Sequence, residues 1–86
     1  MTVSAQVSIY PLGQSDLTPA IEAAWGAFEA HGISYRPGSM STLLEGEESA
    51  LFAALRDAFK AAGEHGGTVM AITVSNACPR QHKTQG

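Results

Sequence analysis

The chain has little of what metal sites and most catalytic sites are built from. It contains a single cysteine, Cys78, which excludes an internal disulfide and a Cys-x-x-Cys metal pair. Its three histidines, His31, His65 and His82, fall at a helix end, in a glycine-rich loop and in a polar tail. That spacing predicts neither a shared metal nor a base beside a nucleophile. We therefore expect no metal, no cofactor and no enzymatic activity.

Basic residues and long apolar runs are also scarce. Five Lys and Arg against eight Asp and Glu give a formal net charge of −3. A nucleic-acid-binding surface needs clustered positive charge to displace counterions from phosphates, which argues against that class. No apolar run approaches the roughly 18 residues of a membrane span, and no signal-peptide pattern opens the chain. We expect a cytoplasmic protein without a nucleic-acid or membrane partner.

What is present is the composition of one small globular domain. Hydrophobic residues make up 44% of the 86 residues and charged residues 15%, which suits a packed core and not a disordered chain. A domain of this size buries only about 60–65% of the surface that its unfolded chain exposes. Association of subunits would add to that burial, so we expect a homo-oligomer, either a dimer or a tetramer.

Four segments of the chain are predicted to be strands. Apolar and polar residues alternate in the first and last of them, which is the pattern of a strand with one apolar face. The two middle segments are separated by Pro37 and Gly38 and predict a hairpin. The four segments are 3–10, 33–36, 39–45 and 68–75.

Two helices are predicted between these strands, each from apolar residues at helical spacing. The first stripe is Leu17, Ile21, Ala24, Trp25 and Phe28, and the second is Leu51, Leu55, Ala58, Phe59 and Ala62. Ser15, Asp16 and Thr18 are N-cap candidates for the first helix, and Gly32 is its C-cap glycine. The order β-α-β-β-α-β predicts an α+β ferredoxin-like sandwich, in which both helices cover one face of a four-stranded antiparallel sheet.

The second face of such a sheet has no helix to cover it. Tyr10, Leu43 and Ala71 are predicted to lie on this open face among polar side chains. A semi-apolar surface of this kind suits association between subunits better than contact with water. We therefore expect the homo-oligomer to form through the open sheet face.

Three segments resemble the YkoF-type proteins that bind thiamine and hydroxymethylpyrimidine. They read VSIYPL at 7–12, SMSTLLEG at 39–46 and ITVSNACP at 72–79, and they occur in the family's order. The resemblance implies a ferredoxin-like ligand-binding domain over 1–79, followed by a polar tail at 80–86. It also implies assembly of such domains through their sheets, and binding of thiamine or its pyrimidine moiety without catalysis.

Thr42 is the first candidate for a ligand contact. Its position between Met40 and Leu44 places its hydroxyl on the side of the sheet that faces the helices, where a buried hydroxyl needs a partner. That partner is either a neighbouring carbonyl or the aminopyrimidine of the ligand. Ser41, the next candidate, has the opposite orientation and lies on the open face.

Four further residues have both a binding and a structural interpretation. Tyr10 can stack on a heteroaromatic ring or belong to a subunit interface. Ser75 and Asn76 can bond the edge of a pyrimidine, although Asn before a Cys-Pro turn is ordinary turn chemistry. Glu45 can meet a thiazolium cation, although acids are also common near a helix N-terminus. Trp25 is interpreted as a core residue.

We expect a non-catalytic binding protein for thiamine or hydroxymethylpyrimidine. The alternative from the sequence is a ligand-free interaction or regulatory module that works through its open sheet face. Titration with the vitamin and its pyrimidine distinguishes the two.

Overall fold

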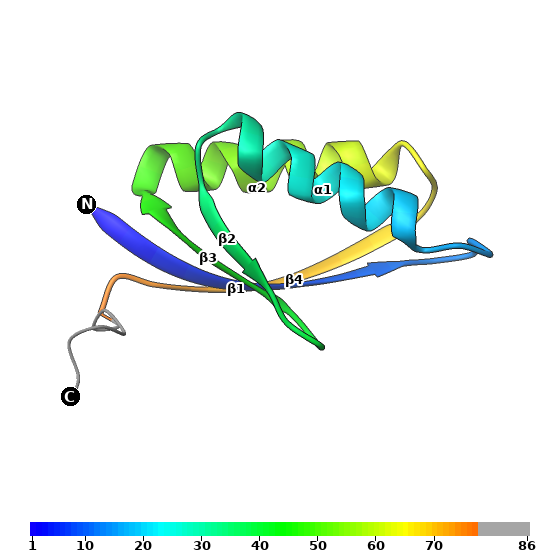
Figure 1. The fold of residues 1–86 in the computed structure, drawn as a ribbon, viewed down its shortest axis with the longest axis horizontal. Helices are drawn as coiled ribbons and strands as arrows, with labels where there is room; N and C mark the ends of the chain where they lie inside the picture. The colour runs from blue at the N-terminus through cyan, green and yellow to red at the C-terminus, as the bar shows by residue number, and fades with distance from the viewer. Residues whose placement is uncertain (78–86) are drawn as a thin grey trace.

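Four strands and two helices follow one another in the predicted order (Figure 1). The computed structural model describes residues 1–77, so Cys78 and the predicted tail at 80–86 lie outside the described residues. The elements are β1 (Thr2–Pro11), α1 (Thr18–Ala30), β2 (Ser34–Pro37), β3 (Thr42–Glu47), α2 (Glu48–Gly63) and β4 (Thr68–Ser75). No helix within residues 1–77 is long and apolar enough to cross a lipid bilayer.

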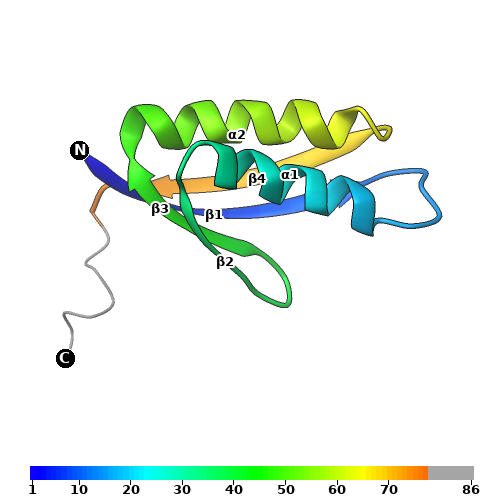
Figure 2. The ribbon, with the colours of Figure 1, turned by 45° about the horizontal axis from the view of Figure 1, so that its top comes forward.

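The strands form one antiparallel sheet in the order β2-β3-β1-β4. Both helices lie on the same side of this sheet, and its other side carries no helix (Figures 1 and 2). This confirms the predicted ferredoxin-like arrangement. β1 is a central strand, and β4 forms one edge of the sheet. The register places Val7 opposite both Thr42 and Ile72.

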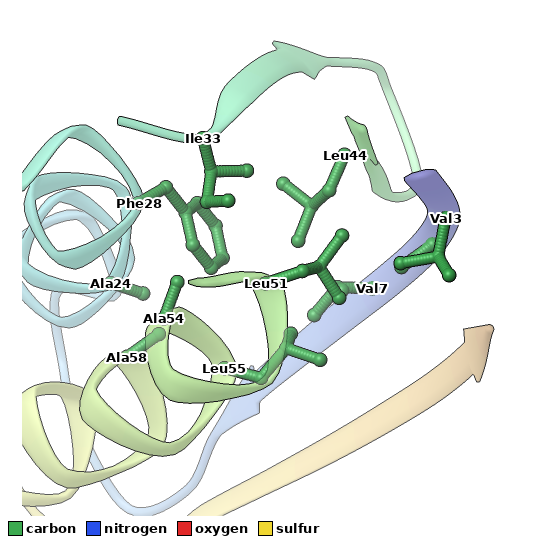
Figure 3. Packing of buried hydrophobic residues seen from close by; sticks show 11 residues of the cluster. Val3, Val7, Ala24, Phe28, Ile33, Leu44, Leu51, Ala54, Leu55 and Ala58 are labelled. Atoms are coloured by element: carbon green, nitrogen blue, oxygen red, sulfur yellow. The ribbon is translucent and has the colours of Figure 1, made fainter. Parts of the chain in front are cut away.

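The core lies between the helices and the sheet. Figure 3 shows Phe28 of α1 and Leu51 and Leu55 of α2 close to Val7 and Leu44 of the sheet. β1, β3 and both helices supply buried residues to this cluster, and Ile33 enters it from just before β2. By contrast, none of the eight residues of β4 is buried.

Gly46 provides space for Ile33 in this core. It lies opposite the buried Val3, which places it on the helix-facing side of β3. A Cβ atom at this position would be 2.7 Å from Cδ1 of Ile33. Ile33 is itself buried, so the missing side chain of Gly46 is what allows β3 and Ile33 to pack closely.

The start of the first helix differs from the prediction. Its N-cap is Leu17, which has no capping side chain, and Thr18 is the first helical residue instead of a cap. The Asp16 carboxylate does accept a hydrogen bond from the Thr18 backbone N–H, at 3.1 Å. The helix ends at Ala30 and its C-cap is His31. The predicted terminating glycine, Gly32, follows the C-cap directly and has a φ of 69°, in the left-handed region that favours glycine.

Three predicted apolar residues are more exposed than their patterns suggested: Met40, Phe59 and Leu17, the last of which is 44% exposed. β3 begins at Thr42, and Met40 is 85% exposed in the turn before it, where the Gly38 N–H donates to the Ser41 carbonyl. Met40 therefore does not share the buried side of β3 with Thr42 and Leu44. Phe59 belongs to the predicted stripe of the second helix but is half-exposed.

Candidate functional site

Thr42 is the one buried polar residue of the described chain, with 6% of its surface exposed. It is the first residue of β3, and its alternation with Leu44 turns its side chain toward the helices, as predicted. Its Oγ1 accepts a hydrogen bond from the indole Nε1–H of Trp25 on α1, at 3.3 Å. The partner of Thr42 is therefore a tryptophan side chain and not the neighbouring carbonyl that one interpretation expected.

Trp25, the partner of this hydroxyl, belongs to a group of three aromatic rings. Trp25 and Tyr35 have ring centroids 6.2 Å apart with planes inclined by 30°, and Phe28 and Tyr35 are 5.9 Å apart at 54°. We call Trp25, Phe28 and Tyr35 the aromatic cluster. Phe28 is fully buried, whereas Trp25 and Tyr35 are partly exposed at the margin of the core. The cluster thus has a buried end and a solvent-accessible end.

A carboxylate lies at the accessible end of the aromatic cluster. The Tyr35 hydroxyl donates a hydrogen bond to Oε2 of Glu29, an exposed residue of α1. This bond raises the pKa of the Tyr35 phenol above its ordinary value, because removing the proton would break the bond and place two negative charges side by side. Hydroxyl, aromatic and carboxylate groups therefore follow one another from Thr42 to Glu29.

Such a set of groups suits a nitrogen heterocycle. Aromatic faces accept a stacked ring or a cation, and a carboxylate accepts hydrogen bonds from an amino group or balances a positive charge. The Thr42 hydroxyl uses an acceptor site for Trp25, which leaves its proton able to bond a ring nitrogen.

The other predicted site residues lie on the open face, at two separate places. Ser41 accepts a hydrogen bond from Gln6 at 3.3 Å, and the exposed Tyr10 lies opposite Val69. Glu45 and Ser75 both lie opposite Ser4, on its two sides. Ser4 and Tyr10 are six positions apart along β1, which corresponds to roughly 20 Å.

Ser75 and Asn76 take part in local bonds at the end of β4. The Ser75 hydroxyl accepts from the backbone N–H of Ala77 at 3.0 Å, and the Asn76 side-chain amide contacts the sulfur of Met1 at 3.4 Å. These contacts are those of the turn interpretation. The structure thus brings Glu45 and Ser75 near each other but places both apart from Thr42.

Two residues of the aromatic cluster region were missed from the sequence. Glu29 lies four positions after Trp25 on α1, so the two share a helix face. Tyr35 lies opposite Leu44 and therefore points toward the helices. The four-residue spacing of Trp25 and Glu29 is visible in the sequence, whereas the orientation of Tyr35 depends on the register between β2 and β3. Trp25 packs against the core, as its interpretation required.

Comparison with protein families identifies the relatives of this chain. The model of the YkoF-related family matches residues 2–81, which is nearly the whole sequence. The chain belongs to the YkoF-related family. No curated protein sequence matches this YkoF-related chain at a significant level.

Several solved structures share the fold of this YkoF-related chain. A protein from Methanocaldococcus jannaschii has a TM-score of 0.81 at 21% identity, with 96% of this chain and 88% of that chain covered. A DUF77 domain of unknown function from Bacillus cereus has a TM-score of 0.77 at 23% identity, covering 87% and 75%. A Thermotoga maritima protein, provisionally described as a thiamine biosynthesis/salvage protein, has a TM-score of 0.74 at 17% identity, covering 86% and 82%. At these identities the likeness shows the fold alone.

Proposed function

We propose that this chain is a non-catalytic binding protein for thiamine or for its hydroxymethylpyrimidine moiety. Membership of the YkoF-related family supports a thiamine-related ligand, as does the description of the Thermotoga maritima neighbour. The observation that carries the proposal is the hydrogen bond between Thr42 and Trp25, which holds a hydroxyl beside the aromatic cluster at the margin of the core.

Each part of the ligand has a matching group in this arrangement. The pyrimidine ring nitrogens accept hydrogen bonds, and the Thr42 hydroxyl retains a proton that it can donate. Trp25 and Tyr35 offer partly exposed aromatic surface for stacking. Glu29, which accepts from Tyr35, adds a negative charge that suits the amino group of the pyrimidine or the thiazolium cation.

Calorimetric titration with thiamine and with hydroxymethylpyrimidine tests the proposal. Replacing Thr42 with valine retains the shape of the side chain and removes the hydroxyl. The affinity should fall by about 1–2 kcal/mol, or roughly five- to thirtyfold, if the hydroxyl bonds the ligand. Thr73→Val is the matched control, because Thr73 is an exposed threonine on the opposite face of the sheet.

Trp25 offers a second readout, since it is the one tryptophan in the chain. A ligand that stacks on the aromatic cluster should change its fluorescence in the wild type and in Thr73→Val alike. The proposal fails if neither ligand binds the wild type. The assignment of Thr42 fails if Thr42→Val folds and binds as tightly as Thr73→Val.

We also propose that copies of this chain associate through the open sheet face. Tyr10, Leu43 and Val69 are all half-exposed there, and the face has no helix above it. Leu43→Lys would place a charge in the middle of this surface, so it should reduce the mass measured by light scattering. A wild-type protein that remains monomeric at micromolar concentration would exclude this association.

A further inference from the structure

Tyr35 and Glu29 form a side-chain bridge between β2 and α1 at the accessible end of the aromatic cluster. The Tyr35 hydroxyl donates to Oε2 of Glu29, and the two residues are six positions apart in the chain. Tyr35 belongs to a strand of only four residues at the edge of the sheet, and Glu29 is the last but one residue of α1. The bond therefore holds the carboxylate at the hydroxyl edge of the Tyr35 ring.

The same carboxylate also lies next to the second accessible ring. Glu29 follows Trp25 by one helical turn and shares its face of α1. The Trp25 and Tyr35 rings are 6.2 Å apart and inclined by 30°, so Glu29 lies at the margin of both. Stacked aromatic rings are offset, so the edge of one lies over the edge of the other. A ring stacked on Tyr35 would thus present an edge to Glu29.

Glu29 differs from the acidic residues that have a structural role. Glu47 accepts from backbone N–H groups at the start of α2, and Asp57 pairs with His31 and Arg56. Within residues 1–77, by contrast, Glu29 forms no ion pair, and its hydrogen-bond partner is an uncharged phenol. Glu29 also lies near the C-terminal end of α1, where the helix dipole disfavours a negative charge. The helix alone gives no reason for an acid at this position.

The bridge presents hydrogen-bond acceptors to a ligand. Tyr35 has one proton to donate and donates it to Glu29, and the raised pKa of Tyr35 keeps that proton in place at neutral pH. An ionised carboxylate has about four acceptor sites, of which Tyr35 uses one. The remaining sites can accept an N–H group of a ligand, whereas an oxo oxygen at the same place would meet another acceptor.

We propose that Glu29, positioned by Tyr35, selects a ring that carries an amino group over a ring that carries an oxo group. The amino group donates to Glu29 while the ring stacks on the aromatic cluster. This inference rests on the proposed function and specifies the part of the vitamin that Glu29 recognises, which is the amino group of the pyrimidine and not the thiazolium cation. Tyr35 is a positioning residue, because it acts through Glu29.

Calorimetric titration with two uncharged compounds tests the proposal. One is hydroxymethylpyrimidine, and the other is its analogue with an oxo group in place of the amino group. Neither contains the thiazolium ring, so a difference between them does not arise from attraction of a cation. Glu29 is exposed, so water can replace a lost ligand contact, and the wild type should prefer the amino compound by only about tenfold.

Glu29→Gln is the decisive variant. The amide retains the shape of the side chain and an oxygen that can accept from Tyr35, but its NH₂ group can donate to an oxo oxygen. The preference for the amino compound should therefore fall to about threefold or less. Thr42 is unchanged in this variant, so the change in preference reports Glu29 alone.

Two further variants separate position from charge. Glu64→Gln removes the same charge from an exposed residue at the end of α2, and it should keep the wild-type preference. Tyr35→Phe retains the ring and removes the hydroxyl that holds Glu29. It should reduce the preference, while the change in Trp25 fluorescence on ligand binding persists because the stacking surface is retained.

The outcomes distinguish this inference from the proposed function. If the wild type binds neither compound, both fail together. If the wild type binds hydroxymethylpyrimidine but Glu29→Gln keeps the wild-type preference, this inference alone is overturned. The same holds if Glu64→Gln loses the preference as well, or if Glu29→Gln weakens the binding of thiamine only, which would assign Glu29 to the thiazolium cation.

Discussion

The hydrogen bond between Trp25 and Thr42 should make the effects of substituting the two residues strongly non-additive. Trp25→Phe leaves the Thr42 hydroxyl, only 6% exposed, without its observed donor, which costs about 1–3 kcal/mol. Thr42→Val leaves the indole N–H of Trp25 without its acceptor. Trp25 is partly exposed, so water can take the place of that acceptor, and we expect the free energy of unfolding to fall by less than about 1 kcal/mol. In the Trp25→Phe background, Thr42→Val should instead restore stability, because it removes the unpaired buried hydroxyl.

Urea unfolding of the wild type, both single variants and the double variant measures this coupling. Circular dichroism is the appropriate probe, since Trp25→Phe removes the one tryptophan. The bond length of 3.3 Å is long for an N–H···O bond, so we expect a coupling energy of about 1 kcal/mol. If the double variant's change in the free energy of unfolding equals the sum of the two single changes to within about 0.3 kcal/mol, the reasoning that this bond satisfies the buried hydroxyl is refuted.

Three further predictions concern packing, pH and ligand charge. Gly46→Ala should destabilise the fold by about 1–3 kcal/mol in urea, since the new methyl group meets Cδ1 of Ile33; a loss below about 0.5 kcal/mol would contradict this. The hydrogen bond from the Ser49 backbone N–H lowers the pKa of Glu47 from its ordinary 4.5. The ionised Glu47 side chain therefore stabilises the fold above the unfolded-state pKa, and this contribution is lost as the pH falls through the lower folded-state pKa. Glu47→Gln should therefore flatten the loss of stability on acidification, and an unchanged slope would exclude that role. Free thiamine should bind more tightly than its diphosphate in titrations, with a gap that widens at low salt, because the chain has a net charge of −3; tighter binding of the diphosphate would reveal an anion site.

The order and type of the elements could be predicted because local patterns determine them. The alternation in β1 requires a one-sided strand, and the stripe containing Ala24 and Phe28 requires a helix that faces the core. The end of β2 and the start of β3 were less predictable. The turn at 38–41 closes through a backbone hydrogen bond, and this displaces Met40 from the strand that its spacing suggested.

The site was predictable only where strand parity determines it. Parity places Thr42 on the helix side and Ser41 on the open side, and the structure agrees. The register of β1 with β4 is a long-range property that no local pattern reveals. It places Ser75 opposite Ser4 and Tyr10 opposite Val69, so residues that looked like one site lie at two ends of a strand. The 47% exposure of Phe59 is likewise a tertiary property, because helical spacing alone does not show which part of an apolar stripe the sheet covers.

The pairing of the first strand with the last has a consequence for the order of folding. β1 is synthesised before the other three strands of this sheet, and its position between β3 and β4 requires partners from later in the chain. Contacts of such long sequence separation carry a large loop-closure cost, which slows folding. During synthesis β1 can pair with β3 first, but one side of it stays unpaired until β4 has left the ribosome. A pause in translation before residue 68 would therefore prolong a state that exposes Val7 and Ile9 to other chains, and chaperone binding should be greatest at that stage.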